Sequence, residues 1–205
     1  MVDQIVVQPR GVFYLPHCKG LVKKENGNYF YDIEDLDHNG KVDLSDGGDR
    51  YIAGQATPKV ILGSNISFRY KNYYISIQMN GAFGHKIFNG TGLAYTSMAC
   101  FPDYNVFKDA PKKNIIDQRV SDYWLEKGDY LNFEHLTIGY NVPLRSKLIR
   151  SLRVSCNISN IGTITGYKGL TPMINSYVVN STMGIDDKRN YPLYRTYSLG
   201  LSVQF

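Results

Sequence analysis

The sequence contains no long apolar run. No stretch approaches the ~18 consecutive apolar residues of a membrane-spanning helix, so we expect no such helix. Residues 1–20 contain no apolar run flanked by basic residues, and therefore no signal peptide is predicted there. A strand that crosses a membrane exposes only half of its residues to lipid, so both absences are compatible with a membrane protein built from strands.

Cysteine and tryptophan are also scarce, with three Cys and one Trp in 205 residues. Cys18, Cys100 and Cys156 are far apart and form no C-x-x-C pair, which argues against a zinc site or a thioredoxin-like motif. Tyrosine and glycine are frequent by comparison, at 17 and 19 residues. This composition is typical of twisted strands and turns.

The formal net charge of +5 raises the question of nucleic-acid binding. The basic residues cluster loosely at 108–113 and 145–147, in segments that we expect to be loops and that lack interleaved stacking aromatics. A solvated loop surface is therefore favoured, and no nucleic-acid partner is predicted. No catalytic constellation emerges either, because the histidines are scattered and no serine has a partnered His and Asp at a recognisable spacing. We expect no enzyme.

Alternation with a period of two is the strongest positive pattern. Near the C-terminus every second residue is apolar and the others are small or polar; the apolar ones are Tyr197, Leu199, Leu201, Val203 and Phe205. Side chains of a strand point to alternate faces, so this pattern gives one apolar and one hydrophilic face. Similar alternation predicts strands at 62–70, 73–83, 136–142 and 152–159, and an earlier strand is expected near 11–21, although Pro16 weakens it.

The expected class is all-β, and the apolar faces are predicted to face lipid. The runs are about 9 to 11 residues long, which suits a tilted transmembrane strand. The residues predicted to face lipid are Leu62, Ile66, Phe68, Ile75, Ile77, Met79, Ile138, Val154, Ile158, Leu199, Leu201 and Val203.

Connection lengths provide an independent signal. A tight turn at Lys71-Asn72 is followed by a long link at 84–129, a short turn at 143–150 and a second long link at 162–192. Outer-membrane barrels have short periplasmic turns and long external loops, whereas a soluble sandwich has no reason to alternate in this way. The pattern predicts an antiparallel transmembrane β-barrel segment with long extracellular loops.

Residues 35–46 follow the calcium-loop pattern D-x-D-x-N-G-x-V-D-x-x-D. Such loops bind Ca²⁺ through oxygen atoms at fixed positions, with a glycine at the sharp turn. The predicted metal ligands are Asp35, Asp37, Asn39, the carbonyl of Lys41, Asp43 and Asp46, with Gly40 at the turn. Without an ion the segment is an Asx-rich turn, but the mutual repulsion of four close carboxylates favours a structural Ca²⁺.

Several separated segments resemble the SusC/RagA family of TonB-linked (TonB-dependent) outer-membrane receptors. The hallmark region is Trp124–Leu131 running into Leu136–Pro143. Similar segments, in family order, are Asp49-Arg50, Pro58-Lys59, Tyr70-Lys71-Asn72 and Asn160–Gly169. The resemblance covers about residues 11–205, and one departure is Thr171-Pro172-Met173, where the family usually has Asp-Pro-Glu. This departure puts a binding role of that loop in doubt.

The resemblance implies that residues 1–205 are the C-terminal part of a plugged barrel of ~22 strands, contributing its last five or six strands. Residues 28–50 form a calcium-loop-like extracellular insertion, and the plug domain is absent. Such receptors lie in the cell outer membrane, pair with a SusD-like surface lipoprotein and import glycans or peptides. They use energy from the TonB complex, which would act through an N-terminal part missing here. On this reading the chain is not the whole precursor.

Two rival functions remain open. A soluble calcium-dependent β-sandwich that binds carbohydrate would show the same alternation and the same aspartate loop (residues 35–46), but would bury its apolar faces in a closed core. A barrel-embedded lipase would need a nucleophile–histidine pair that the sequence does not display.

Overall fold

The computed structural model describes residues 2–3, 8, 10–45, 47–145, 148–174, 183–188 and 190–205. The chain divides into two compact units, each assembled from three segments. The loop unit comprises Met1–Pro58, Gly84–Gly128 and Tyr167–Tyr191. The sheet unit comprises Lys59–Phe83, Asp129–Gly166 and Pro192–Phe205.

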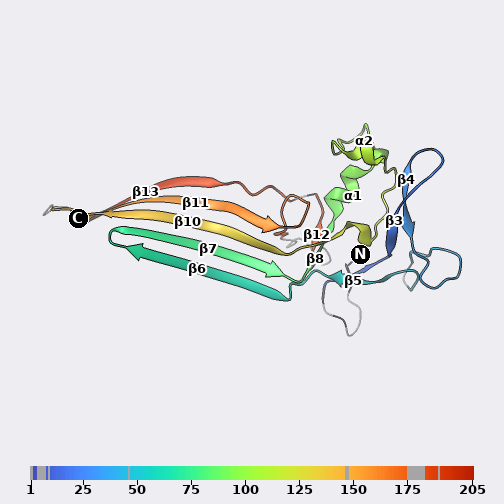
Figure 1. The fold of residues 1–205 in the computed structure, drawn as a ribbon, viewed down its shortest axis with the longest axis horizontal. Helices are drawn as coiled ribbons and strands as arrows, with labels where there is room; N and C mark the ends of the chain where they lie inside the picture. Colours follow the sequence, from blue (N-terminus) through green and yellow to red (C-terminus); the bar gives the residue numbers. More distant parts are fainter. Residues whose placement is uncertain are drawn as a thin grey trace. The chain divides into compact units, whose positions relative to one another are not determined.

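The sheet unit is a five-stranded antiparallel sheet (Figure 1). Its strands are β6 (Val60–Tyr70), β7 (Tyr73–Phe83), β10 (Tyr130–Val142), β11 (Ser151–Thr165) and β13 (Thr196–Gln204). They lie in the order β13-β11-β10-β7-β6. All five strands predicted from alternation are confirmed, and β10 and β11 extend beyond the predicted ends.

The connections follow the predicted alternation of short and long. β6 and β7 are joined by a tight turn at Lys71-Asn72, in which Lys71 adopts a φ of 51°. β10 and β11 are joined by residues 143–150, whereas the connections from β7 to β10 and from β11 to β13 run largely through the loop unit. The short turns therefore lie at one end of the sheet and the long connections at the other.

The apolar side chains of the sheet are largely exposed, as predicted. The most exposed of the predicted lipid-facing residues are Leu199 (85%), Leu201 (69%), Phe68 (64%) and Ile66 (56%). Leu62, Ile75, Ile138, Val154 and Val203 are also exposed, while Ile77, Met79 and Ile158 are intermediate. The described residues of the sheet unit contribute nothing to the chain's hydrophobic core cluster. A closed two-sheet core, as a sandwich requires, is not present in the described part of the chain.

A β-bulge interrupts β10 between Phe133 and His135 and changes which residues share a face. Phe133 is opposite Met79, and His135 is opposite Gln78, the next residue of β7. Glu134 is therefore an extra residue, and its carboxylate accepts hydrogen bonds from the side chains of Gln78 and Asn80, each at 3.1 Å. The bulge adds a charged group to the polar face of the sheet.

The loop unit contains shorter elements. Its strands are β1 (Val2–Asp3), β2 (Val12–Leu15), β3 (Cys18–Lys23), β4 (Tyr29–Ile33), β5 (Tyr51–Gln55), β8 (Lys86–Asn89), β9 (Leu125–Lys127) and β12 (Ile185–Asp186). Its helices are α1 (Gly90–Thr96) and α2 (Ala110–Lys113), with 3₁₀ turns at Met98–Cys100 and Asp122–Trp124. The buried core consists of Phe13, Leu15, Tyr31, Ile33, Ala56, Phe88, Ile115 and Trp124.

Two local features differ from the sequence expectations. The strand expected near 11–21 is split in two, because β2 ends at Leu15, β3 begins at Cys18, and the two pair with different strands. Pro16 lies at the break, where its missing N–H cannot contribute to a ladder. The short helices α1 and α2 were not predicted, since neither is long enough to show a 3.6-residue period. Among the described residues, no helix has both the length and the apolar character needed to span a membrane.

Candidate functional site

The aspartate loop is organised around a carboxylate that the calcium pattern did not include. Asp49 is 1% exposed and accepts backbone N–H groups from Leu36 (2.6 Å), Asp37 (3.3 Å) and Asp43 (2.7 Å). Oxygen atoms of Asp35, Asp37 and Asp49 lie within 4.8 Å of one another. These three carboxylates are the group that could hold a cation.

The remaining predicted ligands are placed differently. The amide of Asn39 donates to Asp37 (2.7 Å), and its carbonyl oxygen accepts from the backbone of Lys41 (2.8 Å). The carboxylate of Asp43 accepts the backbone N–H and the hydroxyl of Ser45, both at 2.8 Å, and these bonds lower the pKa of Asp43. Asp46 lies outside the described residues. The set Asp35, Asp37, Asn39, Lys41, Asp43 and Asp46 stays a prediction.

A second polar cluster anchors the segment that carries Tyr123 and Trp124. The Asp122 carboxylate accepts the backbone N–H of Cys18 (2.7 Å) and the Tyr51 hydroxyl (2.7 Å), and lies 2.6 Å from His17 Nδ1. The contact to Tyr51 adds to burial in raising the pKa of that phenol. The cluster joins the 3₁₀ turn at Asp122–Trp124 to the start of β3 and to β5.

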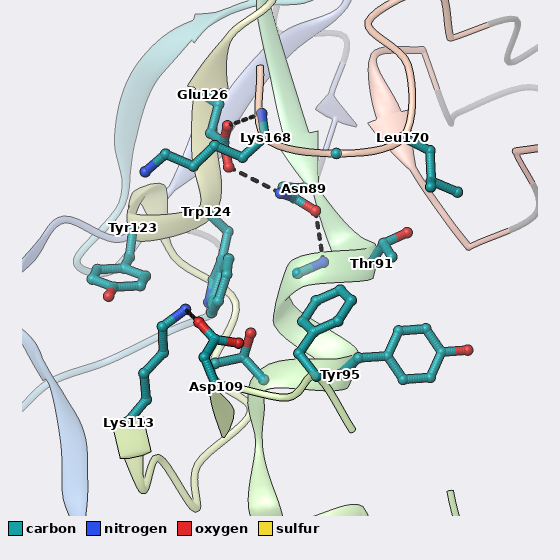
Figure 2. Close-up of a pocket in the computed structure, with 14 residues that line it drawn as sticks. Asn89, Thr91, Tyr95, Asp109, Lys113, Tyr123, Trp124, Glu126, Lys168 and Leu170 are labelled. Carbon is teal, nitrogen blue, oxygen red and sulfur yellow. Dashed lines mark hydrogen bonds and ion pairs between the residues drawn. The ribbon is translucent and has the colours of Figure 1, made fainter. Parts of the chain in front are cut away.

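A pocket of about 840 Å³ lies in the loop unit (Figure 2). Its aromatic lining comes from Tyr95, Phe107, Tyr123 and Trp124. Trp124 is 8% exposed, and its indole N–H donates to the Tyr31 hydroxyl at 3.0 Å. The volume is within the range of small-molecule sites, which is about 300 to 1,000 Å³.

Charged side chains also line the pocket. Lys113 forms an ion pair with Asp109 at 2.7 Å, and this contact lowers the pKa of Asp109. The Glu126 carboxylate accepts the side-chain amide of Asn89 and the backbone N–H of Lys168, both at 2.9 Å. Figure 2 shows these contacts as dashed lines, with the Lys168 ammonium pointing away from Glu126.

A buried aspartate holds the pocket wall that carries Lys168. Asp186 is 1% exposed and accepts hydrogen bonds from the hydroxyls of Tyr167 and Thr91, each at 2.8 Å. Burial, together with the contact to Asp186, raises the pKa of Tyr167. The segment beginning at Tyr167 is thereby tied to the start of α1.

No protein-family model matches the sequence. Two curated relatives do. TonB-dependent receptor P3 of Formosa agariphila is 28% identical over 188 residues, which are 83% of this chain and 18% of that protein. TonB-dependent receptor SusC of Bacteroides thetaiotaomicron is 26% identical over 198 residues, which are 90% of this chain and 18% of that protein.

Solved structures share the fold. The RagAB peptide importer in its "open-open" state matches with a TM-score of 0.71 at 18% identity, covering 95% of this chain and 22% of the matched one. Its "closed-closed" state matches with a TM-score of 0.70 at 16% identity, covering 95% and 23%. The chain thus spans less than a quarter of the length of the proteins it resembles. With the hallmark segments and the sheet, these matches show that the chain is similar to a small part of SusC/RagA-type TonB-dependent receptors.

Proposed function

We propose that the sheet unit is part of the wall of an outer-membrane β-barrel that imports nutrients. The observation that carries this proposal is the contrast between the two faces of the sheet. Leu199, Leu201 and Phe68 are exposed on the apolar face. On the other face, the side chains of Gln78 and Asn80 both donate hydrogen bonds to the Glu134 carboxylate. Lipid on one side and a watery lumen on the other require this arrangement.

The proposed barrel includes strands from outside these 205 residues. Within the described part of the chain, β6 and β13 each have a single partner, so both edges of the sheet are open. Single-chain bacterial barrels have at least about 8 strands, and the five seen here could not close. In our proposal, residues 1–205 are the C-terminal part of a barrel of ~22 strands, whose plug lies elsewhere in the receptor.

Partner and cargo are inferred from the relatives. We expect a SusD-like surface lipoprotein as partner, glycans or peptides as cargo, and energy from the TonB complex acting through a part of the receptor outside this chain. Residues 28–50 would then be an extracellular insertion of the loop unit. The rival soluble β-sandwich is not favoured, because the apolar faces of the sheet are exposed.

The aspartate loop is proposed to bind one structural Ca²⁺. Support comes from the close approach of Asp35, Asp37 and Asp49 and from the match of residues 35–46 to a calcium pattern. Oxygen atoms at ~2.3 to 2.6 Å are the ligands that Ca²⁺ prefers, and millimolar external calcium fills even weak sites. The ion would order the loop and perform no chemistry.

Deletion of the receptor gene in its native host tests the import proposal. The wild-type protein should be found in the outer-membrane fraction, and the deletion strain should lose growth on at least one glycan or peptide mixture supplied as sole nutrient. Complementation with the intact gene should restore that growth. A chain recovered in the soluble fraction, or unchanged growth across the whole panel, would contradict the proposal.

A further inference from the structure

We propose that the pocket of the loop unit binds a ligand that carries a carboxylate beside an apolar group, with the Lys168 ammonium as the partner of the carboxylate. This ligand chemistry is that of the C-terminal residue of a peptide with an apolar side chain. The inference rests on the proposed import function, because it names a chemical feature of the cargo. It concerns the pocket shown in Figure 2.

The charges of the pocket leave one ammonium available. Lys113 is neutralised by Asp109 at 2.7 Å. The two oxygens of Glu126 are engaged by Asn89 and by the backbone of Lys168. The Lys168 ammonium makes no hydrogen bond or ion pair with any residue that the structure describes. A ligand carboxylate would supply its missing partner, and a charge-assisted hydrogen bond of this kind is about twice as strong as a neutral one.

The rest of the exposed lining favours an apolar group. Phe107, Tyr123 and Leu170 line the pocket and are 42%, 40% and 56% exposed, so apolar area is available to a ligand. Burying such area is favourable by about 25 cal/mol per Å². These side chains come from three separate segments of the loop unit, and together they form a wall able to contact one ligand group from several sides.

The aromatic rings that line the pocket form two edge-to-face pairs. Tyr95 and Phe107 meet at 65° with centroids 5.9 Å apart, and Tyr123 and Trp124 meet at 76° with centroids 5.1 Å apart. Edge-to-face pairs of this kind stabilise each other.

The pocket is held in place without a ligand. Asn89 caps α1 by accepting the N–H of Gly92 at 2.6 Å, and its amide holds Glu126. Trp124 is fixed by Tyr31, and the wall that carries Lys168 is fixed through Asp186. A preformed site lowers the ordering cost of binding, so even small ligands should bind measurably.

Fluorescence provides a direct test, because Trp124 lines the pocket and is the only tryptophan of the chain. The whole chain, in detergent micelles and in lipid vesicles, is titrated with N-acetyl-phenylalanine, its carboxamide and N-acetylglycine. N-acetyl-phenylalanine should change the emission saturably. The carboxamide, which lacks the charge, and N-acetylglycine, which lacks the ring, should each bind about tenfold more weakly.

Two lysine variants test whether the charge of Lys168, and not a change in the fold, causes the preference for the acid. Lys168→Met should bind the acid and the carboxamide equally, whereas Lys127→Met, which removes an exposed charge that does not line the pocket, should keep the tenfold preference. Blue-shifted emission from the buried indole verifies the folded pocket in each sample. Three results would overturn the proposal. The unmodified chain binds the acid and the carboxamide equally, or Lys168→Met keeps the preference for the acid. The third is that no saturable signal is seen although blue-shifted emission shows that the pocket is folded.

The same data separate this inference from the import proposal. The titration measures binding alone and involves no transport, whereas the gene deletion measures growth alone. A receptor that supports growth but binds none of the three probes keeps its import function and loses this site. A chain that binds the acid selectively keeps the site even if the deletion leaves growth unchanged.

Discussion

The loop unit and the sheet unit place their large apolar side chains in different surroundings. In the loop unit, Phe13 is 0% exposed and Leu15 and Phe88 are each 1% exposed. In the sheet unit, Leu199 and Leu201 of β13 are 85% and 69% exposed. Both units are built from the same chain, with an ordinary hydrophobic content of 43%.

The two units therefore differ in what covers their apolar side chains. The loop unit has a core of its own side chains, so its apolar groups leave water when the chain folds. The strands of the sheet unit are joined by backbone hydrogen bonds, and polar side chains contact one another on one face. On the other face, no described residue of the chain packs a hydrophobic core against the apolar side chains. We propose that lipid covers this apolar face.

A matched pair of phenylalanine substitutions should show the largest difference in stability between the two units. Phe13→Ala should destabilise the loop unit by about 3 to 5 kcal/mol, because it leaves a cavity in a closed core. Phe68→Ala, at a side chain that is 64% exposed, should leave the loop unit's stability unchanged. Denaturant unfolding followed by Trp124 emission measures both. Similar losses for the two variants would indicate that the units do not differ as described.

Arginine substitutions on β13 test which face meets lipid. Leu201→Arg should cost ~2 to 4 kcal/mol if the residue lies near the bilayer midplane. Ser198→Arg, on the opposite face and paired with Asn157, is the matched control and should cost much less. Unfolding of the complete receptor from lipid vesicles gives the two values. A larger loss for Ser198→Arg would reverse the assignment of faces.

A glycine of β10 tests how closely the Tyr74 ring packs on the polar face of the sheet. Gly139 is opposite Tyr74, and a Cβ at this position would overlap the Tyr74 ring. Gly139→Ala should therefore cost about 1 to 3 kcal/mol by overpacking. The double variant Gly139→Ala with Tyr74→Ser should recover most of that loss, as residues in contact couple. Strictly additive losses in the same vesicle assay would count against a Tyr74 ring lying over Gly139.

Calcium should have the smallest effect, confined to the loop unit. Calorimetric titration of the metal-free chain should show weak binding in the millimolar range. Asp37→Ala and Asp49→Ala should remove the signal. Asp43→Ala should retain it, because the Asp43 carboxylate hydrogen-bonds to Ser45 and is not one of the three carboxylates that lie close together. Heat equal to the Asp37→Ala baseline would leave an Asx-rich turn without an ion. Loss of the signal with Asp43→Ala as well as with Asp37→Ala would favour the ligand set predicted from the sequence.

The strands were predictable because their physics is local. Alternating apolar residues such as Leu199 and Leu201 lie on the same face of a strand, whatever surrounds that face. The bulge at Glu134 was not predictable, since an extra residue shifts the alternation by one and hides the start of β10. Asp49 was missed as a candidate ligand because it lies beyond the 12-residue pattern, although its place in the segment Asp49-Arg50 offered a signal. The pocket brings together residues as distant as Asn89 and Lys168, which no periodicity reveals.

Spin labels placed along β13 test whether the apolar face of the sheet unit contacts lipid. In the complete receptor, with the native cysteines replaced, single nitroxides are placed at Leu199, Leu201, Ser198 and Ser202. Their collision with oxygen and with a water-soluble nickel chelate is compared in lipid vesicles. We expect the accessibility of the labels to alternate with a period of two. Labels at Leu199 and Leu201 should be accessible to oxygen, and labels at Ser198 and Ser202 to the chelate. Labels at Leu199 and Leu201 that are reached by the chelate, or shielded from both reagents as in a closed core, would contradict it.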